Sequence, residues 1–141
     1  MKIHEKYISR CIDIAKNGLG ATAPNPMVGC VIVHDSNIIG EGYTSPYGEA
    51  HAEVNAINSV KDKSLLKEAT LYVTLEPCQM CAGALYWSQI SKIVYGARDL
   101  KRGCINLKTK LHPKTTIEGG VLEEAASTLM KRFFVEKRNL N

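Results

Sequence analysis

Apolar positions follow helical spacing in four segments of the chain. Residues 7–15 and 52–60 place apolar side chains three or four positions apart, which predicts two amphipathic helices. A third helix is expected over residues 80–87, where we expect Tyr86 and Trp87 to pack in the core rather than stack on bases. Residues 121–134 pair apolar side chains at four-residue intervals, which predicts a terminal helix with one buried stripe that includes Phe133 and Phe134.

Extended segments lie between these helices. The continuously apolar run Val28–Val33 is typical of a central strand covered on both faces, and Asp35-Ser36-Asn37 turns it into a second strand at residues 38–39. Further strands are expected over residues 70–75, 93–95 and 115–118. The tight strand, helix and strand order from 70 to 95 predicts a parallel pair with a right-handed crossover. We expect an α/β fold, with one sheet between helices and irregular segments at 21–26 and 101–113.

Composition is that of one globular domain, which we place at residues 1–141. The hydrophobic fraction is 45% and the charged fraction 23%. The start of the chain is charged and the longest apolar run is far too short to span a bilayer, so we expect a cytoplasmic protein without a membrane partner. Five cysteines form no even disulfide framework. We expect Cys11 and Cys30 to be buried and Cys104, among charged residues, to be exposed.

Positive charge is concentrated in the second half of the chain. Residues 1–75 have seven Lys and Arg against eight Asp and Glu, whereas residues 76–141 have eleven against six. Between Lys92 and Lys114 the only acid is Asp99. The seven bases of this segment are Lys92, Arg98, Lys101, Arg102, Lys108, Lys110 and Lys114. On charge alone, the segment fits either a phosphate backbone or a solvated loop.

Two short motifs carry the candidate chemistry. His51-Ala52-Glu53 is followed 27 positions later by Cys78 of Pro77-Cys78-Gln79-Met80-Cys81. In a helix that starts at Cys78, the two sulfurs project from one face, and His51 can join them if it stands at the entrance of its own helix. One imidazole, two thiolates and a water complete the tetrahedral shell of a catalytic Zn²⁺. Glu53 is then a spare carboxylate that can move protons.

A structural zinc site is the alternative for the same residues. It needs a fourth protein ligand in place of water. The candidates for that ligand are Cys30, His34, Cys104 and His112. Such a site has no use for Glu53 or for an open coordination position, so the catalytic interpretation is favoured.

The combination of His-x-Glu with Pro-Cys-x-x-Cys is the signature of zinc nucleobase deaminases. The whole chain resembles a cytidine-deaminase-superfamily domain, and this resemblance implies a three-layer α/β/α fold with a mixed sheet of about five strands. Its first half, with Pro24-Asn25-Pro26 and Gly40-Glu41-Gly42-Tyr43, is similar to the pyrimidine deaminase domain of riboflavin biosynthesis. Its second half, with Met80-Cys81-Ala82-Gly83-Ala84 and Gly96-Ala97-Arg98-Asp99, is similar to bacterial tRNA adenosine deaminase.

The chain is thus a hybrid by resemblance, engineered or recombined, and the segment Ala69–Cys78 suits both families. The riboflavin family has a longer insert between its cysteines, with substrate-phosphate contacts, for which Cys-x-x-Cys leaves no room. The tRNA family usually has an asparagine where this chain has Thr44.

The resemblance also implies a mechanism and a set of contacts. It implies one zinc held by His51, Cys78 and Cys81, and Glu53 as the group that moves protons from water to the ring and to the departing ammonia. The expected substrate contacts are Asn25, Thr44, Ala52, Arg98, Lys101, Arg102, Lys137 and Arg138.

Three functions follow, of which we favour deamination of the wobble adenosine in tRNA. Deamination of the riboflavin-pathway pyrimidine nucleotide is the close alternative, and a non-catalytic zinc-stabilised RNA-binding module is the third. The resemblance further implies a homodimer.

Overall fold

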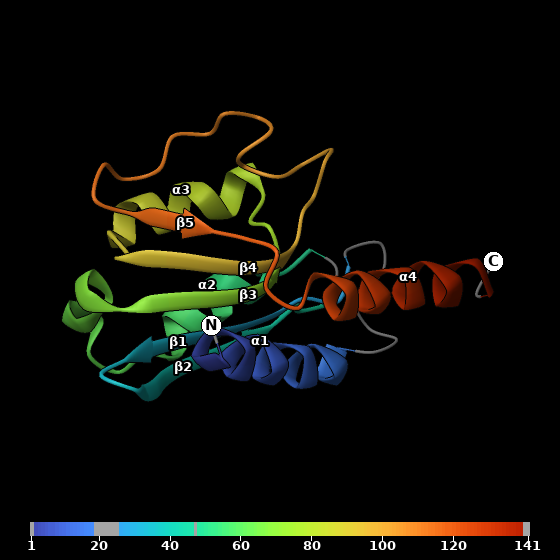
Figure 1. Cartoon of the computed structure of the whole chain (residues 1–141), viewed down its shortest axis with the longest axis horizontal. Helices are drawn as coiled ribbons and strands as arrows, with labels where there is room; N and C mark the ends of the chain where they lie inside the picture. Colours follow the sequence, from blue (N-terminus) through green and yellow to red (C-terminus); the bar gives the residue numbers. More distant parts are fainter. Residues whose placement is uncertain (1, 19–25, 47, 140–141) are drawn as a thin grey trace.

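The computed structural model of the chain describes residues 2–18, 26–46 and 48–139, with side chains described as far as Arg132 (Figure 1). Its centre is a five-stranded sheet of order β2-β1-β3-β4-β5. Strand β1 is antiparallel to both of its neighbours, whereas β3, β4 and β5 are parallel to one another. The strands are β1 Gly29–His34, β2 Asn37–Tyr43, β3 Thr70–Leu75, β4 Lys92–Ala97 and β5 Thr116–Glu118.

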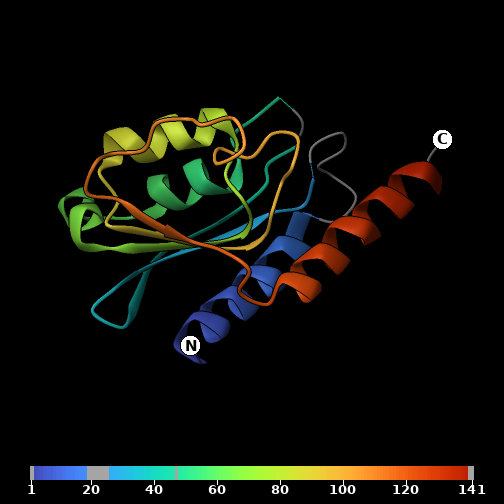
Figure 2. The same cartoon turned by 45° about the horizontal axis from the view of Figure 1, so that its top comes forward.

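Helices cover both faces of this sheet, as the α/β prediction requires. Helices α1 and α4 lie together on one face, and α2 and α3 lie together on the other (Figure 2). The four α-helices are α1 Lys2–Ala15, α2 Ala52–Ser59, α3 Gln79–Ser88 and α4 Glu123–Asn139. Two short 3-10 helices, η1 Lys16–Gly18 and η2 Lys63–Glu68, add to them. The mixed α/β/α sandwich is therefore confirmed.

The hairpin β1–β2 is closed by a two-residue turn. Asp35 and Ser36 both have positive φ, 48° and 63°, and His34 pairs with Asn37 across the turn. Positive φ at both central positions is the geometry that matches the right-handed twist of the flanking strands. The turn sets the pairing of His34 with Asn37, and a bulge between Ile32 and Val33 then shifts the register by one residue, which brings Tyr43, at the end of β2, beside Gly29 at the start of β1.

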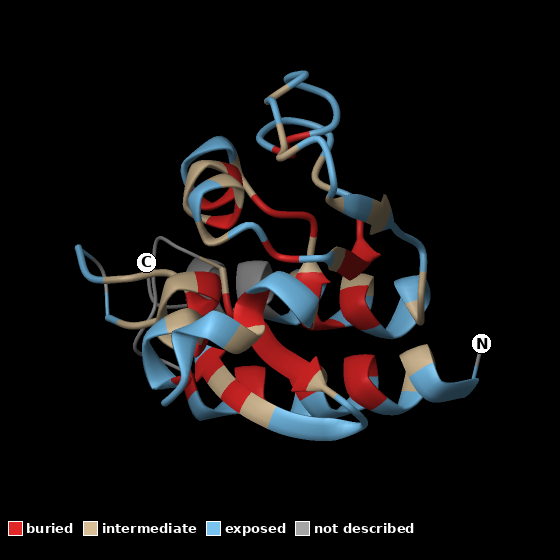
Figure 3. Ribbon diagram, turned by 90° about the vertical axis from the view of Figure 1, so that its left-hand side faces the viewer, coloured by how far each residue is buried: buried red, intermediate tan, exposed pale blue. Residues whose placement is uncertain are grey.

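Buried residues concentrate in the sheet and on the helix faces that touch it (Figure 3). Strand β1 is buried from Gly29 to Val33, as its continuous apolar run predicts. Alternate residues of β1 enter two separate cores: Cys30 and Ile32 pack on the α2–α3 face, and Val31 packs on the α1 face. The sheet is thus sealed on both sides, which holds the strand ends in fixed positions.

Most sequence expectations for the fold are confirmed. All five strands and all four α-helices occur, α3 provides the crossover between the parallel strands β3 and β4, and Cys11 and Cys30 are fully buried. Residues 98–115, which include the expected loop 101–113, form no helix and no strand. The expected irregular segment 21–26 lies outside the described residues except for Pro26.

Two expectations were wrong. Cys104 is only 1% exposed, and burial raises the pKa of its thiol to about 11. Trp87 is 82% exposed, because α3 packs through Cys81, Ala82 and Leu85 on its opposite side.

No helix among the described residues has the length and apolar character needed to cross a bilayer.

Close packing of α1 on the sheet yields a first prediction. A Cβ atom built on Gly29 would lie 1.9 Å from the carbonyl oxygen of Cys11, a backbone atom that cannot turn aside. Gly29→Ala therefore forces α1 away from β1 and should lower the free energy of unfolding by about 1–3 kcal/mol. Urea denaturation followed by circular dichroism measures this. Gly83→Ala, where no atom lies within 4 Å of the new Cβ, is the matched control and should not be destabilised.

Candidate metal centre

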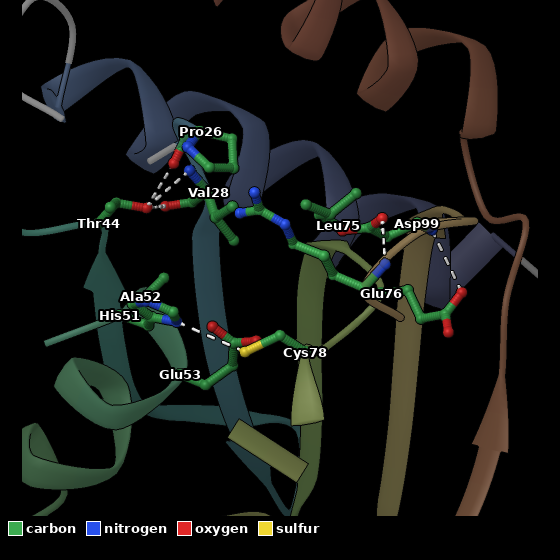
Figure 4. Close-up of a pocket in the computed structure, with 11 residues that line it drawn as sticks. Pro26, Val28, Thr44, His51, Ala52, Glu53, Leu75, Glu76, Cys78 and Asp99 are labelled. Carbon is green, nitrogen blue, oxygen red and sulfur yellow. Dashed lines mark hydrogen bonds between the residues drawn. The ribbon is translucent and has the colours of Figure 1, made fainter. Parts of the chain in front are cut away.

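Two helices begin at the same end of the sheet, and each presents a metal-binding side chain at its N-cap, the residue just before the helix. His51 is the N-cap of α2, and Cys78 is the N-cap of α3, both with extended backbone. Neither side chain is used to cap its own helix, so both are available to a ligand. His51 and Cys78 point toward one another across the pocket, with Glu53 beside them (Figure 4). The requirement that His51 stand at a helix entrance is therefore met.

The distances within this group fit zinc. The Nδ1 atom of His51 lies 3.3 Å from the sulfur of Cys81 and 3.7 Å from the sulfur of Cys78. A tetrahedral Zn²⁺ with ordinary Zn–N and Zn–S bonds separates such atoms by about 3.6 Å. The three ligand atoms all lie within 4.8 Å of one another. The donor set, one imidazole and two thiolates, is one that zinc accepts in catalytic sites.

A fourth protein ligand is not present among the described residues. The cluster contains His51, Cys78 and Cys81 and no other His, Cys, Asp or Glu side chain of the described part of the chain. The candidates that a structural site would need, Cys30, His34, Cys104 and His112, all lie outside it. The geometry thus leaves one tetrahedral position for water or substrate, which favours the catalytic interpretation.

The two thiols differ in their acidity. The hydrogen bond from the Cys81 thiol is the main reason that the pKa of Cys78 falls to about 5. The same hydrogen bond is the main reason that the pKa of Cys81 rises. Cys78 is therefore a thiolate at neutral pH before any metal binds, and a thiolate is the form that coordinates zinc.

Glu53 lies in the first turn of α2 and is 4% exposed. Burial away from water raises the pKa of its carboxyl group to about 7. A carboxyl group with such a pKa can both accept and donate a proton near neutral pH. Glu53 thus combines the position and the acidity that general acid–base chemistry needs.

A pocket opens beside the cluster, and several expected substrate contacts line it. Thr44, Ala52 and Arg102 lie in its wall together with His51 and Glu53. The hydroxyl group of Thr44 is already engaged, since it donates to the Pro26 carbonyl at 3.0 Å and accepts from the Val28 amide at 3.0 Å. Thr44 therefore holds the pocket wall together, because its hydroxyl group joins the backbone of Pro26 and Val28.

The other expected contacts fall elsewhere. Arg98 and Lys101 are exposed and do not line the pocket. Asn25 lies outside the described residues, as do the side chains of Lys137 and Arg138 on α4.

Five pocket residues were missed from the sequence. They are Pro26, Val28, Leu75, Glu76 and Asp99. Two of them had a usable signal: Glu76 directly precedes the Pro-Cys-x-x-Cys motif, and Asp99 is the one acid in a long basic segment. The remaining three are apolar, and an apolar residue in the sequence can belong either to a pocket wall or to the core.

Residues 1–97 match the family described as the cytidine and deoxycytidylate deaminase zinc-binding region. The chain belongs to this deaminase family. The family is one of zinc-dependent deaminases, and His51, Cys78 and Cys81 lie close enough together to hold the metal.

Relatives of two kinds are similar to the chain. The diaminohydroxyphosphoribosylamino-pyrimidine deaminase of Buchnera aphidicola is 35% identical, over 94% of this chain and 94% of that protein. The tRNA-specific adenosine deaminase of Haemophilus influenzae is 40% identical, over 79% of this chain and 72% of that protein.

Solved structures give the same two groups. Acinetobacter baumannii RibD has a TM-score of 0.83 at 35% identity, over 94% of this chain and 39% of that one. A structure from a study of A-to-I editing by tRNA:A34 deaminases has a TM-score of 0.72 at 25% identity, over 88% of this chain and 98% of that one. The chain spans only 27% of the riboflavin biosynthesis protein RibD of Escherichia coli, to which it is 44% identical.

Zn²⁺ held by these residues would supply a water of lowered pKa and a positive charge that polarises the substrate. The protein's own contribution is to hold His51, Cys78 and Cys81 on rigid helix starts and to keep Glu53 in a buried position next to them.

Loss of one sulfur ligand tests the metal centre. Cys78→Ala and Cys81→Ala each leave two protein ligands, so we expect zinc occupancy to fall from one per chain to near zero after dialysis. Metal analysis by mass spectrometry measures it. Cys104→Ala is the matched control and should retain full zinc, because this buried cysteine lies outside the cluster. Full occupancy in both ligand variants would contradict the assignment.

Proposed function

We propose that the chain deaminates a pyrimidine nucleotide of the riboflavin pathway, the substrate class named for its Buchnera relative. The observation that carries this proposal is the origin of the pocket wall. The part of the wall formed by Pro26, Val28, Thr44, His51 and Glu53 comes from the half of the chain that resembles the riboflavin family. Similarity at full length to a deaminase of that pathway supports the same substrate.

In this proposal Glu53 is the catalytic residue. Its carboxylate takes a proton from the attacking water and transfers it to the ring nitrogen next to the reacting carbon. It then takes the second proton from the hydroxyl group now on that carbon and gives it to the amine, so that the C=O bond forms, the C–N bond breaks and ammonia leaves. Burial keeps the pKa of Glu53 near 7, so that both directions of transfer are accessible at neutral pH. Neither step needs a second acid in the pocket.

Deamination of the wobble adenosine in tRNA is the second candidate, and sequence analysis favoured it. It is supported by the exposed basic segment that continues from the pocket rim. Lys101, Arg102, Lys108, Lys110 and Lys114 are all exposed. The comparisons include relatives of both kinds and do not separate the two substrates. Relatives of the riboflavin kind extend over more of the chain, which is why we now place that substrate first.

A non-catalytic zinc-stabilised RNA-binding module is the least supported candidate. It would place no demand on position 53, where burying an acid away from water is unfavourable without a purpose. Dimer formation and a cytoplasmic location stay predictions of the sequence.

The catalytic role of Glu53 is tested by Glu53→Gln. The amide keeps the shape and the buried volume but cannot transfer protons, so we expect ammonia release to fall by about a hundredfold to ten-thousandfold. Zinc content and thermal melting should stay close to the unaltered protein. Turnover within a few fold of the unaltered protein would rule out the proposed role.

The substrate is tested by supplying the pyrimidine nucleotide and an anticodon stem-loop RNA separately and measuring ammonia. We expect turnover of the nucleotide with little dependence on salt, because few counterions are released when a single phosphate binds. Lys108→Glu combined with Lys110→Glu should leave this turnover unchanged, since both residues are exposed and lie outside the pocket. Turnover of RNA alone, with loss of activity in that double variant and at raised salt, would instead establish the tRNA substrate.

A further inference from the structure

Glu76 is a second buried carboxylate at the pocket, and the proposed chemistry does not use it. It follows the last residue of β3 and precedes Pro77 and the metal ligand Cys78. Its residue is 2% exposed, and its side chain is fully buried. Burying a carboxylate is unfavourable unless hydrogen bonds and a counter-charge compensate for the lost water. The partners of Glu76 therefore indicate what the residue does.

Those partners are backbone amides from both ends of one turn. The Asp99 amide donates to Oε1 of Glu76 at 3.3 Å, and the Ile105 amide donates to Oε2 at 2.9 Å. Arg98 supplies the counter-charge, with its Nε atom 3.9 Å from Oε1 (the Asp99 bond is drawn in Figure 4). One carboxylate thus closes residues 99–105 into a loop.

Further hydrogen bonds hold the loop, some within it and one to Pro77, which precedes Cys78. The side chain of Asp99 accepts hydrogen bonds from the amides of Lys101 and Arg102, at 3.1 Å and 2.9 Å. The Cys104 amide donates to the carbonyl of Pro77 at 2.9 Å. Residues 99–105 are consequently fixed to the segment that carries the metal ligand.

Gly103 is the position where the loop and Glu76 touch. A Cβ atom there would lie 2.1 Å from Oε2 of Glu76 and 2.5 Å from the carbonyl oxygen of Asp99. Any larger residue must therefore push the carboxylate and the loop apart. This contact gives a way to disturb the arrangement without altering a charged group.

The loop held by Glu76 carries Arg102 and determines where this residue lies. Arg102 lines the pocket and is exposed, so its guanidinium is in contact with water. Among the described residues no ion pair involves Arg102, in contrast to Arg10 and Arg98. A guanidinium without a carboxylate partner at the mouth of a nucleotide pocket has the fork of donors that a phosphate group accepts.

We infer that Glu76 is a positioning residue, which holds the 99–105 loop so that Arg102 binds the phosphate of the substrate. This inference rests on the proposed function for the nucleotide, although an RNA phosphate at the pocket mouth has the same chemistry. Glu76 acts on substrate binding through Arg102 and takes no part in proton transfer.

The experiment measures phosphate binding directly and does not depend on turnover. Ribose 5-phosphate is titrated into the zinc-loaded protein by calorimetry, with ribose as the comparison ligand. We expect Glu76→Gln, Gly103→Ala and Arg102→Ala each to weaken binding of ribose 5-phosphate about tenfold to a hundredfold, as loss of a charged hydrogen bond does. Gly83→Ala, on open surface, is the control and should bind like the unaltered protein.

A double-mutant cycle separates positioning from a general effect on the fold. If Glu76 acts through Arg102, then Gly103→Ala in the Arg102→Ala background should add almost no further loss. An equal loss in both backgrounds would overturn the inference, as would normal binding in Gly103→Ala. Should Glu76→Gln fail to fold, the Gly103→Ala and Arg102→Ala cycle still decides the matter.

Steady-state kinetics then distinguish this inference from the proposed function. With the pyrimidine nucleotide as substrate, Gly103→Ala should raise KM and leave kcat within a few fold, because the metal-binding side chains and Glu53 are unchanged. The zinc content of the variant is measured as well, since Gly103 pairs with the backbone of Cys78. A fall in kcat at unchanged KM would contradict the positioning role. If only RNA is deaminated, the proposed substrate is wrong, and the same split in KM and kcat for RNA would support Arg102 as its phosphate contact.

Discussion

Three ligand atoms that belong to two distant parts of the chain must lie within 4.8 Å of one another, and the rest of the structure serves this constraint. The chain meets it by starting two helices, α2 and α3, at the same end of one sheet. Small buried residues, Ala52 and Ala56 on α2 and Ala82 on α3, let these helices lie close to the strands. A rigid sheet sealed on both faces is what keeps the ligand atoms at bonding separations.

The same burial that fixes the ligands also sets the chemistry. Glu53 is removed from water by the packing that seats α2, and this removal is the first cause of its raised pKa. Glu76 is buried to a similar degree but has two amide donors and Arg98 around it. Because their surroundings differ, the two carboxylates on the same pocket have separate tasks in our proposals, Glu53 in proton transfer and Glu76 in holding a loop.

The fold and the metal ligands could be predicted from the sequence because their signals are local. Apolar spacing marks α1 and β1, and the motifs at His51 and Cys78 carry their own geometry. The loop at 99–105 could not be predicted, since its shape depends on a contact between Glu76 and Gly103 that no periodicity records. Cys104 was misjudged for the same reason: it belongs to a segment rich in charged residues, but the loop turns it inward. Trp87 was misjudged because its apolar type outweighed its position on the outer side of α3.

The hydrogen bonds between Glu76 and the 99–105 loop have a consequence for how related chains can be recombined. The hydrogen bonds described for the loop either lie within residues 99–105 or join them to Glu76 and Pro77, and residues 1–75 contribute none of them. Strand β3, which ends just before Glu76, pairs with β1 through backbone hydrogen bonds, and these are compatible with many side chains. A recombination point within β3 therefore transfers Cys78, Cys81 and the 99–105 loop together, with their mutual contacts intact. Recombination at this strand can therefore join the pocket wall of one relative to the sulfur ligands and the 99–105 loop of another, with the contacts inside each segment kept.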